Sequence, residues 1–529
     1  MKKHILSILS ILALTVSCQD AYEIDQPGYV TEESQVFTNN ASIQRGINAL
    51  YNTISTQTEI EFGSIFTDEV GLGYQNGGQG INDGSFNFVL ESGNTAAATF
   101  WSSNYNIINR INRMLSVVDV KIENNDSELD ELKKSKAELL ALRAFANLKL
   151  FSYFTPDYTN PQGLSIMKLD FLQTDDYNVL LPRATVSEIV AFIEKDIQDA
   201  RNLRYNAEEF GGDNTYVSKA FVNSILVKLY SMTENYDGVI ANAEEIINSN
   251  SYFLNDGTNF LFMFNDNGLD DNSEIIFRLK RVVTQGGGVA NIWFTNRPNI
   301  SGSVLFEIGR SLYNEIDKLD PENFNKVDTE PRRDIRYQVL VHSDSEVAIN
   351  YSSLSYDEYI DKDRLLVGKY LGRTQAIMQN DIMVFRTSDI LLALAEARAA
   401  QGTYTGVNAL NDFSTVSSII YNIRRARINT MDFPALEEPA AMPTITSEQS
   451  AWQAILNERR IEFAFEGHRY LDVKRLGTKA GVGFVRDPQD CVRNSACELD
   501  PNDYKMTLPI PRAEVIANPN IAQNQNPGY

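Results

Sequence analysis

The sequence contains few of the residues that usually form metal sites or nucleophilic active sites. Among its 529 residues there are three histidines, three cysteines and three tryptophans, and no group of histidines and cysteines has the spacing of a zinc site. Residues 265–274 are rich in oxygen ligands, but the glycine and glutamate fall at the wrong offsets for an EF-hand. The glycines at 286–288 are not followed by the Gly-Lys-Ser/Thr of a phosphate-binding loop. We therefore expect no metal site and no cofactor.

Basic residues and long apolar runs are also scarce. The chain has 47 Lys and Arg against 70 Asp and Glu, a formal net charge of −23 at pH 7. Such a balance argues against nucleic acids and anionic membranes as partners. The internal apolar run at 391–394 is bracketed by Asp389, Glu396 and Arg398, so no segment after the N-terminus is predicted to cross a membrane.

The N-terminus holds one short apolar run. Lys2 and Lys3 precede residues 5–16, which have the length of a signal-peptide core and are too short for a stable membrane anchor. The segment ends in Leu-Thr-Val-Ser-Cys, which resembles the bacterial lipoprotein box. That resemblance implies that residues 1–17 are a signal peptide, cut off before Cys18, and that Cys18 is lipidated. The alternative is an ordinary secretory signal with an incidental cysteine.

Two further features agree with export. Removal of residues 1–17 deletes two lysines and no acidic residue, so the formal charge becomes −25; the polar, acidic segment 18–40 is then predicted to be a tether between lipid and body. The other cysteines, Cys491 and Cys497, lie close together in the sequence. In an oxidising compartment a local disulfide is the favoured interpretation, with two free thiols as the alternative.

Helical patterns dominate the rest of the chain. Thr185 followed by Glu188 is a capping box at a helix start, and the region after residue 215 is predicted to form two helices with a break at 234–237, close to a tetratricopeptide hairpin in length. Further helices are expected at 41–54, 97–118, 128–154, 382–401, 415–427 and 447–476. We predict a mainly α body at 41–529, with a helical scaffold at approximately 41–260 and 380–480, few short strands, and a variable loop-rich region at approximately 260–380 plus the loop 71–94.

The most charged stretch is residues 455–477, ILNERRIEFAFEGHRYLDVKRLG. On one helix, Glu458, Glu462 and Glu466 would be i, i+4 neighbours with β-carbons about 5–6 Å apart. Retaining glycosidases place two carboxylates about 5–5.5 Å apart, which suggests an enzyme. However, a glycosidase needs one acid with a raised pKa, and carboxylates on one continuous helix leave little room to flank a sugar.

The composition of this stretch favours a structural role. The arginines Arg459, Arg460 and Arg469 surround the acids and would keep them ionised, and the interleaved apolar residues predict a buried helix. Because unpaired buried charges are costly, we predict an ion-pair lattice that connects helices. His468 is then a packed, hydrogen-bonding residue rather than a general base.

The same stretch carries a family resemblance. ERRIEFAFEGHRYLDVKRLG is similar to the C-terminal signature of the SusD/RagB family of Bacteroidetes outer-membrane lipoproteins, and LPIPRAEVIANPNIAQNQNPGY resembles the end of that family. AELLALRAFANLKLFSYF, LPRATVSEIVAFIEKDIQDA and FRTSDILLALAEARAAQG resemble its helices, and NSEIIFRLK resembles one of its strands. The resemblance covers nearly the whole mature chain and implies a SusD-like scaffold of tetratricopeptide-like helix pairs.

The resemblance also implies a function. Family members are surface-exposed, lipid-anchored proteins of the cell outer membrane that serve polysaccharide utilisation. They capture an oligosaccharide or polysaccharide and hand it to a SusC-like TonB-dependent transporter, and none is an enzyme. RagB-like members capture peptides instead. A tetratricopeptide-type adaptor that binds proteins, and a hydrolase, are the remaining alternatives.

The family's signature residues are scaffold, so ligand-binding residues must be chosen from composition. Two loops combine aromatic rings with amide and guanidinium groups, as carbohydrate sites do. The candidates are Tyr74, Gln75, Asn76 and Asn82 in the first loop and Trp293, Phe294, Asn296 and Arg297 in the second. Trp293 is the best single candidate. The alternative is that its side chain is a hydrophobic plug, buried beneath the loop and packed against the core. Trp101 and Trp452 lie in strong helical patterns and are predicted to be core.

Overall fold

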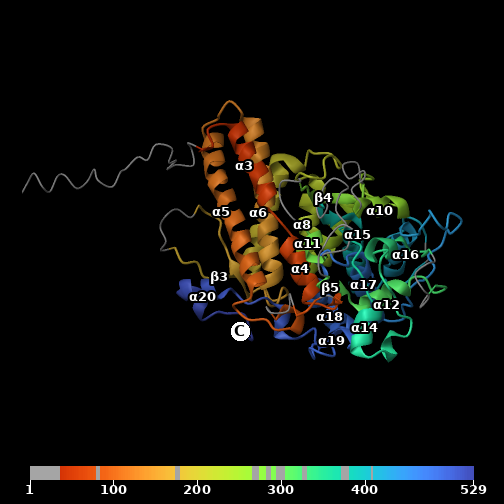
Figure 1. Cartoon of the computed structure of the whole chain (residues 1–529). Coiled ribbons are helices and arrows are strands. Elements are labelled where there is room, and N and C mark those ends of the chain that lie inside the picture. Colours follow the sequence, from red (N-terminus) through yellow and green to blue (C-terminus); the bar gives the residue numbers. More distant parts are fainter. Residues whose placement is uncertain are drawn as a thin grey trace, which may run out of the picture.

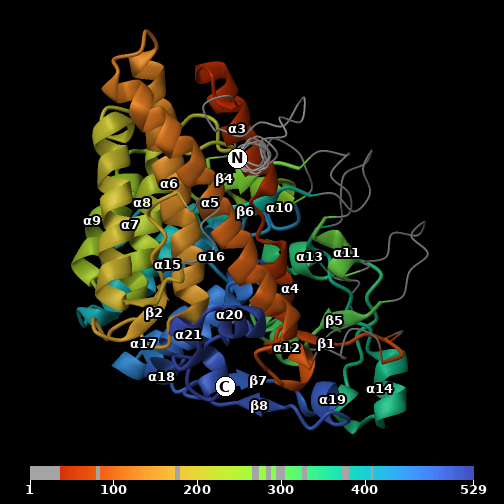
Figure 2. The same ribbon diagram turned by 90° about the vertical axis from the view of Figure 1, so that its left-hand side faces the viewer.

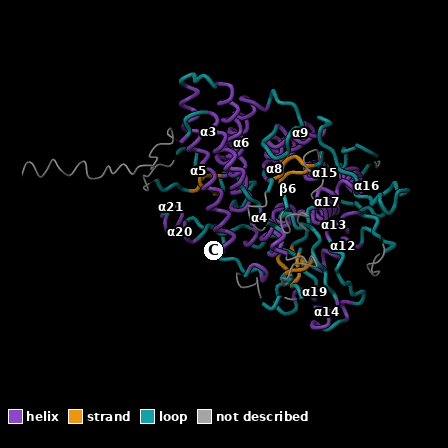
Figure 3. The backbone as a smooth tube through the Cα atoms, turned by 45° about the horizontal axis from the view of Figure 1, so that its top comes forward, coloured by secondary structure: helices purple, strands orange, loops and turns teal. Residues whose placement is uncertain are grey.

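The computed structural model describes residues 36–74, 76–78, 84–172, 179–264, 273–281, 288–293, 304–323, 331–370, 380–406 and 409–529. Helices make up most of this part and strands are few and short, as the SusD-like prediction requires (Figure 3). Figure 1 shows long helices standing side by side at one end of the molecule, and shorter helices, ribbons and loops at the other. None of the described helices is long and apolar enough to cross a membrane.

The long helices of the N-terminal half are those expected from the sequence. They are α3 (Asn40–Thr53), α5 (Thr95–Glu123), α6 (Leu129–Phe154), α7 (Val186–Ala200), α8 (Lys219–Met232) and α9 (Tyr236–Ile247). The predicted capping box is present at α7, where Thr185 Oγ1 accepts from the Glu188 N–H and the Glu188 carboxylate accepts from the Thr185 N–H at 2.8 Å. α5, α6 and α7 pack in sequence, and α8 packs on α9 as a pair (Figure 2).

A second helix pair lies against the first. α15 (Thr387–Ala400) packs on α8, α9, α16 (Val416–Ala426) and α17 (Glu448–Glu462). The predicted helix 382–401 is wrong at its start, because residues 382–386 form strand β6 (Ile382–Arg386), which pairs with β4 (Ile275–Leu279). Both strands are buried in tertiary contacts, and this pairing overrides the local pattern.

The predicted helix 447–476 is also interrupted. α17 ends at Glu462 and α18 (Arg469–Ala480) begins seven residues later. Between them, Phe465 and Gly467 have φ angles of 61° and 83°, in the left-handed region that no α-helix tolerates. Glu458 and Glu462 therefore share a helix as expected, whereas Glu466 lies in the break.

The strands form four two-stranded antiparallel ribbons: β1 (Val70–Leu72) with β5 (Phe306–Ile308), β2 (Leu164–Met167) with β3 (Arg183–Thr185), β4 with β6, and β7 (Phe484–Val485) with β8 (Glu498–Leu499). The shorter helices are α4 (Gln57–Ile65), α10 (Gly257–Phe264), α11 (Ala290–Trp293), α12 (Arg310–Asp317), α13 (Ile335–Leu340), α14 (Tyr356–Lys362), α19 (Pro488–Cys491), α20 (Arg512–Ala517) and α21 (Pro519–Ala522).

One apolar core connects most of these elements, with buried members from Ile43 to Ile521. Trp101 and Trp452 belong to it, at 4 % and 2 % exposure, which confirms their predicted role. The predicted disulfide between Cys491 and Cys497 is present, and it closes the short segment between α19 and β8.

Candidate functional site

The charged stretch at the end of α17 builds a buried ion-pair lattice. Glu462 lies at its centre, where its carboxylate accepts hydrogen bonds from Arg427 at 2.7 Å, Arg386 at 3.0 Å and Arg336 at 3.3 Å. All four side chains are at most 2 % exposed. Because these arginines belong to three separate elements of the fold, the lattice connects them to α17.

Three further carboxylates complete this lattice. Glu458 pairs with Arg336 at 2.6 Å and with Arg424 at 2.7 Å. Glu466 pairs with Arg386 and Lys369, and Glu274 at the start of β4 pairs with Arg386 and Arg427. We call these nine residues and Asp334, which pairs with Arg336 at 2.8 Å, the glutamate–arginine lattice. The predicted ion-pair lattice is thus confirmed.

The electrostatics of the lattice oppose acid catalysis. Burial alone would raise the pKa of Glu458, Glu462 and Glu466, but the cations around them outweigh it and hold each pKa below its usual range. A general acid for glycoside hydrolysis needs the opposite shift. The carboxylates that suggested a glycosidase are therefore ionised structural groups.

The neighbouring arginines do not pair with these acids, contrary to the expectation from sequence. Arg459 pairs with Asp389 at 2.9 Å and with Asp472 at 2.8 Å, while Arg460 and Arg469 pair with Asp68. On a helix, successive residues point in different directions, so Arg459 and Arg460 leave the face that carries Glu458 and Glu462. These three arginines are compensated by aspartates, and not by the glutamates of the same stretch.

His468 fits the predicted packed position. Its ring stacks on Phe463 at a centroid distance of 4.5 Å, and its Nδ1 atom lies 3.4 Å from an Arg459 nitrogen and 4.0 Å from Asp389. Burial lowers its pKa to about 4, and the Lys228 and Arg459 cations act in the same direction. The imidazole is therefore neutral at physiological pH and is held between an aromatic ring and an arginine.

The first predicted ligand loop leaves the β1–β5 ribbon at Tyr74. The Tyr74 ring lies under the guanidinium of Arg364 at 4.6 Å, and its backbone N–H donates to Glu307 Oε1 at 2.7 Å. The second oxygen of Glu307 accepts from the Leu365 N–H at 2.9 Å. The buried carboxyl of Glu307 thus connects the segment that carries Tyr74 to the segment that carries Arg364. The side chains of Tyr74 and Arg364 stay partly exposed.

Other candidates have structural contacts. Asn76 is 5 % exposed, and its amide donates to Leu305 O at 2.7 Å and accepts from the Gly78 N–H, so it fastens the loop to the chain before β5. Trp293 is fully buried, and its ring lies against that of Phe465 at a centroid distance of 5.0 Å. This agrees with the alternative that Trp293 is a hydrophobic plug beneath the loop. Gln75, Asn82, Phe294, Asn296 and Arg297 lie outside the described residues.

Sequence reasoning missed Arg364 and Glu307. Arg364 lies outside the two candidate loops, and Glu307 is 233 residues from its partner Tyr74. No local pattern connects residues so far apart. The only sequence signal was the loop-rich character of the region 260–380, which contains both.

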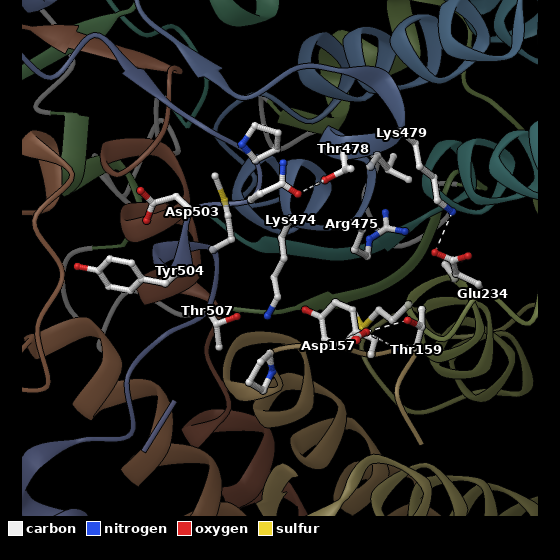
Figure 4. Close-up of a pocket in the computed structure, with 18 of the residues that line it drawn as sticks. Asp157, Thr159, Glu234, Lys474, Arg475, Thr478, Lys479, Asp503, Tyr504 and Thr507 are labelled. Carbon is white, nitrogen blue, oxygen red and sulfur yellow. Dashed lines mark hydrogen bonds and ion pairs between the residues drawn. The ribbon is translucent and has the colours of Figure 1, made fainter. Parts of the chain in front are cut away.

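A cavity of about 390 Å³ lies between α18, the α8–α9 turn and the C-terminal segment (Figure 4). Lys474 extends into it and donates from Nζ to Thr155 O at 2.8 Å and to Ser152 O at 3.2 Å. These are carbonyl groups at the C-terminal end of α6, where helices lack internal donors and favour a cation. Lys474 is therefore a cap for α6, and its burial lowers its pKa.

Several other polar groups around this cavity are also paired. Asp157 accepts from the N–H and hydroxyl of Thr159, and Lys479 pairs with Glu234 at 2.9 Å. Figure 4 shows both pairs on the cavity wall. Few groups remain available to bind a ligand, so we do not place the functional site here.

Comparison with known proteins agrees with the architecture. A model described as "SusD family" matches residues 284–529, and a model described as "Starch-binding associating with outer membrane" matches residues 30–253. The chain is 24% identical to "SusD-like protein P2" of Formosa agariphila over 100% of both chains.

Solved structures share the fold. A SusD superfamily protein from Bacteroides thetaiotaomicron has a TM-score of 0.71 and 21% identity, with 92% of this chain and 100% of that chain covered. A structure titled "Laminarin binding SusD-like protein" has a TM-score of 0.62 and 18% identity, with 93% and 100% covered. The mainly helical prediction is thus confirmed at the level of the fold.

Proposed function

Because the chain belongs to the SusD family and one of its model matches is described as starch-binding, we propose that it is a surface-exposed lipoprotein of the outer membrane that captures an oligosaccharide. It delivers this ligand to a SusC-like TonB-dependent transporter. The observation that carries the proposal is the match of the two family models to nearly the whole chain after residue 29. The laminarin-binding neighbour supports a carbohydrate rather than a peptide.

The proposed ligand face begins at the β1–β5 ribbon. Tyr74 supplies an aromatic ring and Arg364 a guanidinium that is already fixed over that ring. A sugar ring stacks on an aromatic face, and nearby polar groups bond its hydroxyls. Because Glu307 holds both segments, this pair is arranged before the ligand arrives, which lowers the entropic cost of binding.

Calorimetric titration with oligosaccharides from laminarin and starch tests the proposal. Replacing Tyr74 by alanine is expected to weaken the binding of the ligand that responds by about tenfold, or about 1.4 kcal/mol. Tyr216→Ala is the matched control, since Tyr216 is a 44 % exposed tyrosine that contacts Tyr51 rather than Arg364. Binding of peptides and not of sugars would contradict carbohydrate capture and favour the RagB-like alternative.

We further propose that the protein is not an enzyme. The ionised state of Glu458, Glu462 and Glu466 and the neutral, packed His468 support this. The purified protein should leave laminarin and starch oligosaccharides intact during prolonged incubation, as measured by chromatography of the products. Steady cleavage that disappears in Glu462→Gln would contradict the proposal.

Lipidation of Cys18 is part of the same proposal. Several acyl chains on one residue bind a bilayer firmly, because each buried methylene contributes about 0.8 kcal/mol. Replacing Cys18 by alanine is therefore expected to move the protein from the membrane pellet to the soluble fraction. Cell fractionation with a protease-accessibility assay measures this, and a variant that remains in the membrane pellet would show that another part of the protein holds it there.

A further inference from the structure

A large groove lies between the two helix pairs. It has a volume of about 970 Å³ and is bounded by the segment after α9, by α15 and α16, and by the segments on either side of α16. Figures 1 and 2 both separate α16 from β5, so this groove is distinct from the face that carries Tyr74. We call it the helix-pair groove.

An aromatic ring forms one wall of the helix-pair groove. Phe253 is 59 % exposed, although its neighbour Tyr252 is buried in the core. Residues on both sides of Phe253 fix its position. Tyr252 anchors the chain before it, and after it the backbone N–H of Asn255 donates to Glu274 of the glutamate–arginine lattice at 2.7 Å. The groove therefore presents a rigid, flat apolar surface.

The opposite wall is also held in place. The amide of Asn422 on α16 donates to Ala409 O and Asp412 O at 3.0 Å, and its oxygen accepts from the Asn411 N–H at 2.8 Å. These bonds fix the loop that carries Leu410, which is 60 % exposed. Phe413 completes this wall and is partly buried.

The polar side chains of the groove differ from those of the cavity around Lys474. Within the described part of the chain, the side chains of Asn248, Asn411, Arg425 and Thr430 have no hydrogen bond or ion pair, although all four line the groove. Folding therefore leaves two amides, a guanidinium and a hydroxyl available for a ligand.

The combination indicates the class of ligand. Phe253 can stack on the apolar face of a sugar ring, and amide, guanidinium and hydroxyl groups bond its hydroxyls. An acidic peptide fits less well, because Asp256 and Glu437 also line the groove and outweigh the single charge of Arg425. The volume is at the upper end of ligand pockets, which suits several sugar residues.

We propose that the helix-pair groove is a second oligosaccharide-binding site. It goes beyond the proposed function, which needs only one site, and it makes the protein bivalent toward a long glycan. Two sites on one chain turn the second binding event into an intramolecular one, which raises the affinity for a polymer well above that for a short fragment.

The test uses the full mature chain with Cys18→Ala and two probes, fixed-length laminarin and starch oligosaccharides. Calorimetry should give two equivalents of the bound oligosaccharide in the parent chain. Phe253→Ala with Arg425→Ala should weaken one of the two binding events, and Tyr74→Ala should weaken the other by about tenfold. Phe262→Ala is the matched control, because Phe262 is 39 % exposed and lies on α10, outside the groove.

The same variants should be compared on laminarin and starch polymers by affinity electrophoresis. Loss of the groove site is expected to weaken polymer binding by at least tenfold. A single equivalent whose binding only Tyr74→Ala weakens would overturn the second site and leave the proposed function intact. Absence of binding by both probes would overturn both, and groove variants that lose only a co-purifying protein would identify a protein-docking surface and overturn the inference.

Discussion

Replacing Glu462 by glutamine is expected to lower the free energy of unfolding by about 3–5 kcal/mol. The carboxylate is buried and accepts hydrogen bonds from Arg336, Arg386 and Arg427. Glutamine preserves the shape of the side chain but removes its charge and turns one acceptor into a donor that faces a guanidinium. The buried arginines then lack compensation, which is the costly way to break an ion pair.

Urea unfolding followed by circular dichroism measures this change. The matched control is Glu131→Gln, because Glu131 is a 56 % exposed glutamate on α6 that pairs with Lys134 one turn away. Exposed pairs of this kind contribute less than about 0.5 kcal/mol. A Glu462→Gln protein as stable as the control would show that the lattice does not hold the helices together.

The helices illustrate how far local sequence patterns reach. The capping box at Thr185 and Glu188 and the α8–α9 break were predicted correctly, because neighbouring residues determine both. The patterns were wrong at residues 382–386, where pairing with β4 produces a strand, and at 463–468, where Phe465 and Gly467 adopt left-handed backbone conformations. In both places contacts from distant parts of the chain decide the conformation.

The lattice shows the same limit for electrostatics. Burial and pairing of the acids in the stretch 455–477 could be predicted, because apolar residues surround the charges. The partners could not, since Arg386 and Arg336 lie 76 and 126 residues from Glu462. The prediction that the adjacent arginines of α17 pair with these glutamates was wrong. Helical geometry directs Arg460 toward Asp68 and Arg459 toward Asp389.

The candidate ligand residues show a third limit. Composition correctly indicated the loop that begins at Tyr74 as a place where an aromatic ring stays partly exposed. It did not separate Trp293, which the fold buries against Phe465, from a surface ring. Composition also did not identify Phe253 as a candidate ligand residue. A phenylalanine after a helix resembles a core residue until its exposure is known.

Glu307 is expected to make the protein less stable as the pH rises from about 6.5 to about 8. Burial raises the pKa of this carboxyl to about 8, and the nearby acids Asp363 and Asp490 add to the shift, while its two hydrogen bonds from backbone N–H groups oppose it. In the unfolded chain a glutamate has a pKa of about 4.3. Between these values the folded protein keeps a proton that the unfolded chain has released.

The sign follows from proton binding. Stability falls with pH wherever the folded state binds more protons, at about 1.4 kcal/mol per pH unit for one group. The contribution of Glu307 is thus fully present below about pH 4.3 and is lost as the pH rises through about 8. Glu69 and Asp490, with pKa values raised by burial to about 7, act in the same direction. His468, with its pKa lowered to about 4, acts in the opposite direction only below about pH 6.5.

Glu307→Gln isolates this effect, because an amide does not titrate in this range. The variant should lose about 1–3 kcal/mol at every pH, since its amide can accept from only one of the Tyr74 and Leu365 N–H groups. Its stability should nevertheless decline less between pH 6.5 and 8 than that of the parent, as measured by urea unfolding at three pH values. Glu346→Gln is the control, since Glu346 is 61 % exposed at the rim of the same region. Parallel curves for the parent and Glu307→Gln would show that Glu307 is already ionised in the folded protein, so that the backbone N–H groups, and not burial, determine its protonation.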